Sequence, residues 1–158
     1  MAQLIVQVAG RAGRAERPGR VVLQTRHPDH PLVAALLAGG YGAFAEGALA
    51  ERRAASLPPF SYQALLRAEG PAPQEALGWL LQAAQVARES GPRELGVWGP
   101  VPAPMERRAG RFRAQLLVQS EQRALLQAFL SSWVPRLRAL RVRAGVRWSL
   151  DVDPQEML

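Results

Sequence analysis

The sequence predicts an α+β fold, with a short α/β remnant at its N-terminal end. After residue 60, apolar side chains follow patterns typical of a strand, a helix, two strands, a helix and a strand, in that order. Such units normally form an antiparallel or mixed sheet with both helices on one face. In front of them, the proline pair of SLPPFSY (56–62) cannot continue a helix. This pair predicts a domain boundary at 57/58.

Residues 1–57 give the weaker structural signals. The short apolar run GRVVLQT (19–25) predicts a buried strand, and the HPDHP that follows predicts a turn. Residues 31–38 and 43–56 are expected to form two helices separated by the glycine-rich GGYG. Because this part has too little apolar periodicity to close a core by itself, we expect it to be the end of a larger α/β domain.

Residues 58–158 are expected to close their own core. Strand-like alternation covers 60–68, and a helix opened by Pro71 and Pro73 should end at the SGP of 90–92. Their inward side chains are expected to be Phe60, Tyr62, Ala64, Leu66, Ala68, Leu77, Leu80, Leu81, Ala84 and Ala87.

The same alternation continues to residue 152. A second strand is expected at 95–100, followed by a loop rich in proline and arginine, and a third strand at 112–119. A second helix begins at about 121, and Pro135 should kink or interrupt it. The last strand covers 146–152. The inward side chains are expected to be Phe112, Ala114, Leu116, Val118, Leu126, Phe129, Leu130, Trp133, Leu137, Leu140, Val146, Trp148, Leu150 and Val152.

Composition excludes several classes of protein. There is no cysteine, which excludes disulfides and thiolate zinc sites. The longest apolar runs, such as Leu32 to Gly40, are well short of the roughly 20 residues of a membrane helix. The N-terminus has no secretory pattern either. We therefore expect a cytoplasmic location and no membrane partner.

The charge of the chain is unevenly distributed. All 20 basic residues are arginine, against 13 acidic residues, for a formal net charge of +7. Residues 105–147 hold ten arginines against Glu106 and Glu121, a net charge of +8. A basic patch in the C-terminal third predicts a polyanionic partner.

The octet QVAGRAGR (7–14) has the form Q-x-x-G-R-x-G-R of a superfamily 2 helicase motif. A glycine-rich turn with surface arginines would look the same. Four segments in the same order extend the likeness: QVAGRAGRAERPGRVVLQTRHPDHP, YGAFAEGALAERRAASLPPF, GPVPAP and LDVDP. Together they resemble the C-terminal part of the PriA family of primosomal replication-restart DNA helicases, over essentially the whole chain.

The resemblance implies that residues 1–57 are the end of RecA-like helicase lobe 2 and that residues 58–158 are the family's C-terminal DNA-interaction domain, which resembles a ribosomal small-subunit protein. The helicase motif would fall on Gln7, Gly10, Arg11, Gly13 and Arg14. In the family, Arg11 and Arg14 would stabilise the charge that develops on the γ-phosphate of ATP.

The full-length family is an ATP-dependent 3′ to 5′ helicase that also uses magnesium and zinc. This chain has no lysine for a Walker A P-loop and no D-E-x-H segment for a Walker B site. We therefore expect no cofactor in this chain and no ATP hydrolysis by this chain alone.

An arginine cluster surrounds a turn in ERRAGRFRAQ (106–115). Arg107, Arg108, Arg111 and Arg113 stand near Phe112, a pattern typical of nucleic-acid backbone contact. The alternative is a solvated sheet edge, with Phe112 in the core. The family resemblance favours contact with branched or forked DNA.

Arg123 and Gln127 lie one helical turn apart and should share a face. In the family, the equivalent helix helps to bind the acidic C-terminal tail of single-strand-binding protein, where a cation meets the terminal carboxylate. An ordinary exposed helix face is the alternative.

Two further clusters are weak candidates. His27 and His30, with Asp29, are too few for a catalytic zinc site, so we expect no metal. Asp151 and Asp153 could form an acid and base pair, but a solvated or ion-paired strand end is the favoured interpretation.

Three functions remain open from the sequence. The favoured one is a non-catalytic DNA-fork and partner-binding module that meets single-strand-binding protein and other primosome proteins. The second is a part of a split ATPase that supplies Arg11 and Arg14 in trans to a partner with the P-loop. The third is a remnant without function. The sequence does not choose between a natural short protein, a split product and a fragment.

Overall fold

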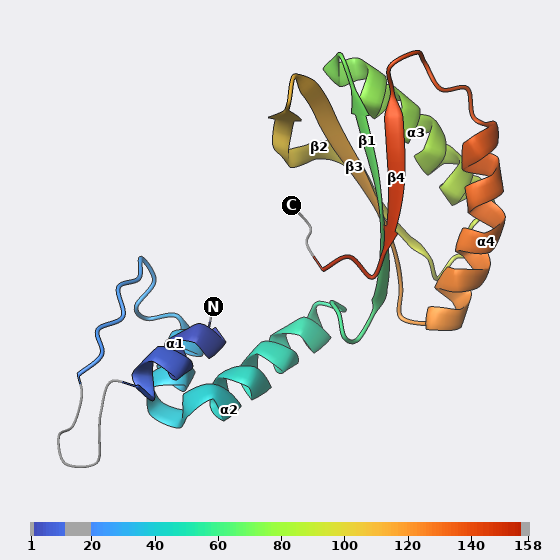
Figure 1. Ribbon diagram of the computed structural model, residues 1–158. Coiled ribbons are helices and arrows are strands. Elements are labelled where there is room, and N and C mark those ends of the chain that lie inside the picture. Colours follow the sequence, from blue (N-terminus) through green and yellow to red (C-terminus); the bar gives the residue numbers. More distant parts are fainter. Residues whose placement is uncertain (1, 12–19, 156–158) are drawn as a thin grey trace. The chain divides into compact units, whose positions relative to one another are not determined.

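The computed structural model describes residues 2–11 and 20–155 and divides into two compact units, Met1–Ala55 and Ser56–Leu158 (Figure 1). The boundary predicted at 57/58 lies two residues from this division. The assignment of the N-terminal unit to a helicase lobe stays a prediction.

The N-terminal unit consists of helix α1 (Ala2–Ala9), helix α2 (Pro31–Ala54) and their connection. Gly40, with φ +69°, leaves the helical conformation inside α2, so the predicted interruption of the helix is narrower than GGYG. Among the described residues of this unit, only Ala2 and Leu36 are buried. The small buried set agrees with the weak apolar periodicity of this part.

The predicted strand at 19–25 is wrong over its described part. Residues 20–25 form neither helix nor strand, and Val22 is 79% exposed. A short apolar run becomes a strand only where another strand supplies hydrogen-bonding partners. The four paired strands of the described chain all belong to residues 62–152 of the other unit.

By length and composition alone, α2 is the one helix of the described ranges that could cross a membrane. Gly40 interrupts it, and each half is far shorter than the roughly 20 residues required. Its second half also carries Glu46, Glu51, Arg52 and Arg53. The helix is therefore weak evidence for a membrane.

The C-terminal unit is a four-stranded antiparallel sheet with both helices on one face (Figure 1). The strand order is β2-β3-β1-β4, so β1 and β3 are central. The α+β architecture and its element order are confirmed in this unit. Its elements are β1 (Tyr62–Gly70), α3 (Pro73–Ser90), β2 (Gly96–Arg108), β3 (Arg111–Ser120), α4 (Arg123–Ala139) and β4 (Arg147–Val152).

The core lies between the helices and one face of the sheet. The register pairs Leu66 with both Leu116 and Leu150, which places the predicted apolar positions of three strands side by side. The helices contribute Leu80 and Trp133, and both are fully buried. The predicted inward alternation of these strands is therefore largely confirmed, although Val152 is 39% exposed at the strand end.

One predicted core position on α3 is wrong, because Leu81 is 56% exposed. The buried face of α3 is centred on Ala76, Leu80 and Ala83, with Trp79 beside them. At roughly 100° per residue, Leu81 lies about a quarter turn or more from that centre. The small side chains of alanine let α3 approach the sheet closely. For this helix, alanines therefore indicate the buried face better than leucines do.

The loop predicted after residue 100 is also wrong. Strand β2 continues to Arg108, with register shifts between Trp98 and Val101 and between Pro102 and Arg107. Proline lacks a backbone N–H donor and is tolerated on an edge strand, which is the position of β2 in this sheet. A tight turn through Ala109 (φ +49°) and Gly110 (φ +77°) then leads into β3.

Candidate nucleic-acid interface

The sheet has one face that the helices do not cover. Successive side chains of a strand point to opposite faces, so the residues between the core positions share this open face. The register places Glu69 of β1 between Arg113 of β3 and Arg147 of β4. One row along, it places Arg67 between Gln115 and Ser149. Arginines from three neighbouring strands thus meet on the open face.

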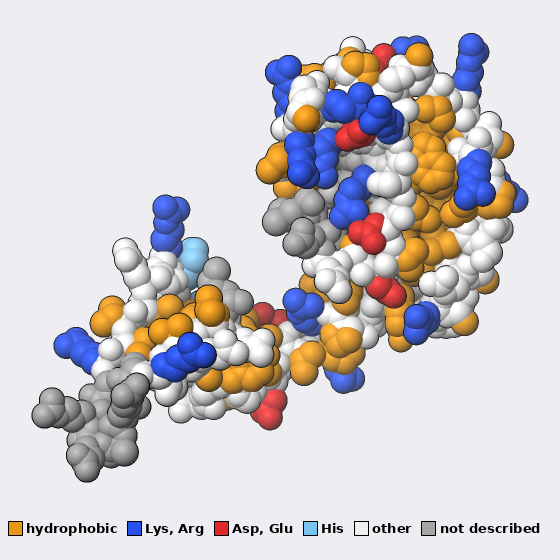
Figure 2. Space-filling model, viewed as in Figure 1, with side chains coloured by type: hydrophobic (Ala, Val, Ile, Leu, Met, Phe, Trp, Pro, Cys, Tyr) orange, Lys and Arg blue, Asp and Glu red, His pale blue; other side chains and the backbone are white. Residues whose placement is uncertain are grey.

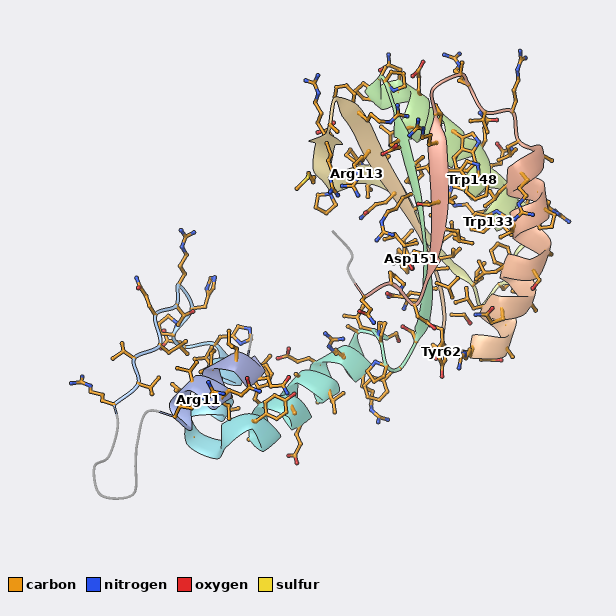
Figure 3. All side chains as sticks on the ribbon, viewed as in Figure 1. Arg11, Tyr62, Arg113, Trp133, Trp148 and Asp151 are labelled. Carbon is orange, nitrogen blue, oxygen red and sulfur yellow. The ribbon has the colours of Figure 1, made fainter. Side chains whose placement is uncertain are left out.

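A cavity of about 290 Å³ lies among these arginines. Figure 2 shows basic side chains gathered on this side of the unit with acidic ones among them, and in Figure 3 Arg113 points away from the helices. Arg67 donates to Asp151 at 3.0 Å, so its charge is partly neutralised. The lining still has three arginines against one acidic residue, Glu69, so the cavity has an excess of positive charge. Its lining residues are Arg67, Ala68, Glu69, Arg113, Arg147, Trp148 and Ser149.

The four arginines predicted to contact DNA do not form one cluster. Arg113 lines the cavity. Arg107 is paired in register with Phe112, and its guanidinium lies 5.3 Å from the centre of that ring, on the helix side of the sheet. Arg108 is exposed at the hairpin end, where its register partner is Arg111.

Arg111 is held by the protein itself. Its Nε donates to Oε1 of Glu69 at 2.9 Å, and its Nη2 donates to the backbone carbonyls of Glu69 and Gly145. Because one guanidinium joins β3, β1 and the segment before β4, it fastens three parts of the fold. This arrangement leaves Arg111 fewer donors for a ligand than Arg113.

Sequence reasoning missed Arg67 and Arg147 as members of the site. Each stands at an outward position of a predicted strand, between inward apolar residues. The strand order needed to bring them beside Arg113 is absent from the sequence pattern. The sequence signal that could have identified them is the presence of arginines at the outward positions of predicted strands.

The helicase-motif residues are only partly described. Gln7 lies on α1, and Gly10 and Arg11 form the turn after it, with all three exposed. Gly13 and Arg14 lie outside the described residues. The proposed role of this motif with ATP stays a prediction.

Arg123 is the first residue of α4, and Gln127 follows one turn later. Both are exposed and share a helix face, as their spacing requires. A cation at a helix N-terminus is unfavourable toward the helix dipole, so Arg123 does not stabilise the helix end. Their role in binding an acidic tail stays a prediction.

Two of the weak candidates, His30 and Asp151, have structural partners. His30 caps α2, since its Nδ1 accepts the N–H of Leu32 at 3.2 Å. Asp151 forms the ion pair with Arg67, in line with the favoured interpretation, and Asp153 follows the end of β4 with φ +53°.

Comparisons with known proteins agree on one family. A family model described as the primosomal protein N C-terminal domain matches residues 53–155. The chain is 45% identical over 157 residues to the replication restart protein PriA of Haemophilus influenzae, covering 99% of this chain and 21% of that protein. It is 33% identical to the Synechocystis protein of that name, covering 96% of this chain and 18% of that protein. It is 30% identical to the Bacillus subtilis protein of that name, covering 99% of this chain and 19% of that protein. The chain thus spans about a fifth of the length of these curated relatives.

Proposed function

Because the chain belongs to the PriA C-terminal domain family, we propose that it serves as a DNA-fork and partner-binding module of a PriA-like replication-restart helicase. The observation that carries the proposal is the arginine-lined cavity on the open face of the sheet. Arginine pairs with phosphate oxygens through a planar fork of donors, and such contacts give affinity without sequence choice.

The distribution of charge supports backbone contact rather than reading of bases. Arg113 and Arg147 flank Glu69 on the open face, and Arg67 is partly neutralised by Asp151. Phosphates of a DNA backbone would approach the first two arginines. Glu69 and Asp151 limit how closely phosphates approach the rest of the face.

We expect Arg113→Ala and Arg147→Ala each to weaken binding to forked DNA about fivefold near 0.1 M salt and to reduce the salt slope by about 1. Each variant removes one phosphate contact, so fewer counterions are released on binding. The measurement is fluorescence anisotropy with a labelled fork across a salt series, using the 158-residue chain.

Arg138→Ala is the matched control, because it removes the same charge from the exposed face of α4. It should leave the affinity within about twofold of the wild-type value. Equal losses in all three variants would show a general charge effect and contradict the open-face site. Affinity that is indifferent to salt would contradict DNA-backbone binding altogether.

For the whole protein, we propose ATP-dependent 3′ to 5′ helicase action at abandoned forks in the cytoplasm, together with other primosome proteins. The family membership supports this proposal. The residues of this chain do not fit the cofactors of that activity, since there is no lysine for a P-loop. Within the described ranges, no group of three His, Cys, Asp or Glu could hold a metal.

We also propose that Arg123 and Gln127 contribute to binding the tail of single-strand-binding protein. Arg123→Ala should weaken binding of an acidic peptide with a free C-terminal carboxylate about threefold, as expected for an exposed ion pair. Peptide titration followed by NMR measures it, with an amidated peptide as control. Equal binding of the two peptides would contradict carboxylate recognition by Arg123.

A further inference from the structure

Strand β2, at the edge of the sheet, carries an exposed tryptophan. Trp98 is 62% exposed, whereas Trp79 and Trp133 are buried and Trp148 is half-buried. Tryptophan combines a large apolar ring with a polar N–H and is enriched where proteins contact other molecules. Trp98 is therefore a candidate contact for a ligand.

The register places Trp98 on the open face of the sheet. Its partner on β3 is Leu117, which lies an even number of residues from Arg113 and so faces the same way. Val101 is 48% exposed and also faces this way, opposite Gln115. An exposed apolar strip on β2 thus shares its face with the arginine-lined cavity, which Arg113 reaches from the neighbouring strand.

The indole of Trp98 lies over Gly96, two residues earlier on the same face of the strand. A Cβ added at Gly96 would come within 2.7 Å of Nε1 and 3.4 Å of Cε2 of this indole. The absence of a side chain at Gly96 therefore leaves room for the ring. A cavity of about 380 Å³ adjoins the pair, and both residues line it. The ring is supported from the strand while most of its surface stays exposed.

Charge divides the open face into two ends. Glu94 and Glu121 are exposed and line the cavity beside Trp98, where they would repel phosphates. Arg113 lies four residues along β3 from Leu117, the partner of Trp98, which is roughly 14 Å at about 3.4 Å per residue. Because stacked nucleotides advance about 3.4 Å each, a few nucleotides can span this distance. One strand could thus place phosphates at the arginines and a base at Trp98.

The arginines on the same face favour a nucleic-acid strand over a basic peptide. A cationic side chain would suit Trp98 and the two carboxylates, but the rest of a basic peptide would be repelled by the arginine-lined cavity. A nucleic-acid strand carries both an anionic backbone and apolar base faces. Aromatic side chains on an antiparallel sheet are a common platform for unpaired bases.

We propose that Trp98 stacks on an unpaired base of a DNA strand whose phosphates lie against Arg113 and Arg147. The inference rests on the proposed function, because the arginines hold the strand. Stacking accepts every base, so it adds affinity without sequence choice. It also gives the open face a preference that phosphate contacts alone do not supply, namely for a fork with single-stranded arms over a blunt duplex.

Two substitutions at Trp98 separate stacking from apolar contact and from charge. Trp98→Leu should weaken binding of a fork with single-stranded arms about tenfold and leave a blunt duplex within about twofold. Since it removes no charge, the salt slope should stay unchanged, unlike that of Arg113→Ala. Trp98→Phe keeps an aromatic ring and should stay within about threefold of the wild type. Leu81→Ala, at a 56% exposed position on the helix side, is the control and should change neither affinity.

Gly96→Ala tests the position of the ring without removing it. The added Cβ would displace the indole, and the next nearest atom outside that ring, the carbonyl oxygen of Gln119, lies at an ordinary 3.6 Å. The variant should therefore fold, and it should weaken binding of the fork while the blunt duplex is unaffected. Its loss should be smaller than that of Trp98→Leu, because the displaced ring can still reach a base.

Tryptophan fluorescence of the 158-residue chain reports the stacking directly. Oligo(dT) should quench the emission of the wild type, and in Trp98→Phe this quenching should disappear while fluorescence anisotropy still shows binding. Quenching that persists in Trp98→Phe, or quenching by a basic peptide but not by oligo(dT), overturns the proposal.

The fork and duplex titrations distinguish failure of this inference from failure of the proposed function. If Trp98→Leu binds the fork as the wild type does, or loses fork and duplex binding equally, stacking is overturned. The proposed function then still stands where binding depends on salt and on Arg113. If the wild-type chain binds neither DNA, both fail.

Discussion

Trp133→Ala is expected to lower the free energy of unfolding of the C-terminal unit by about 3–5 kcal/mol. Trp133 of α4 is fully buried, and its ring lies 5.3 Å from that of Phe129. Its indole N–H donates to the backbone carbonyl of Ala83 on α3 at 3.3 Å. The substitution therefore opens a cavity between the two helices and removes a buried hydrogen bond. Since domains of this size are stable by only about 5–15 kcal/mol, the loss is large.

Urea unfolding followed by circular dichroism measures this effect. Leu81→Ala is a suitable control, because Leu81 is 56% exposed on α3 and should cost less than about 0.5 kcal/mol. The loss of unfolding free energy in Trp133→Phe should lie between those of Trp133→Ala and Leu81→Ala, since phenylalanine keeps an aromatic ring but loses the hydrogen bond to Ala83. A loss below about 1 kcal/mol for Trp133→Ala would show that the two helices are not held together through this ring.

The fold of the C-terminal unit could be predicted because its sequence carries clear periodicities. Alternation in β1, β3 and β4 and the helical stripe of α4 each indicate one inward face, and the tertiary structure uses those faces. The prediction failed where tertiary position overrides local preference. The prolines of β2 argue for a loop, yet the edge of the sheet accepts them.

The candidate site could be predicted only in part. Local clustering along the sequence pointed to Arg107, Arg108, Arg111 and Arg113, but side chains of neighbouring strand positions face opposite sides. The observed group instead joins Arg113 to Arg67 and Arg147, from strands far apart in the sequence. Such a group depends on strand order and register, which single-strand patterns do not contain.

Trp79 illustrates the same limit. It stands outside the inward face predicted for its helix, yet it is 3% exposed and its ring stacks on Trp148 of β4. Its burial depends on how α3 packs against β4, which the helical pattern alone does not contain.

Arg111→Ala is expected to lower the free energy of unfolding by about 2 kcal/mol and to leave the salt slope of DNA binding nearly unchanged. The substitution removes the ion pair with Glu69, whose N–O distance is 2.9 Å, and the donors to the carbonyls of Glu69 and Gly145. The side chains of Arg111 and Glu69 are 25% and 36% exposed, so solvent screening reduces the value of the ion pair itself. The carbonyl of Glu69 would lose a charged donor in a partly buried place, whereas that of Gly145 is exposed to solvent.

The comparison with Arg113→Ala separates a fastening role from a DNA contact, because both changes remove one positive charge from β3. We expect Arg113→Ala to reduce the salt slope of DNA binding with little effect on the free energy of unfolding. Arg111→Ala should lower the free energy of unfolding with little effect on the salt slope. Arg111→Lys keeps the charge but not the planar fork, so it should leave DNA binding unchanged and recover only part of the stability that Arg111→Ala loses. If Arg111→Ala instead lowered the salt slope by about 1 and left unfolding unaltered, Arg111 would be a phosphate contact, as its place in ERRAGRFRAQ predicts.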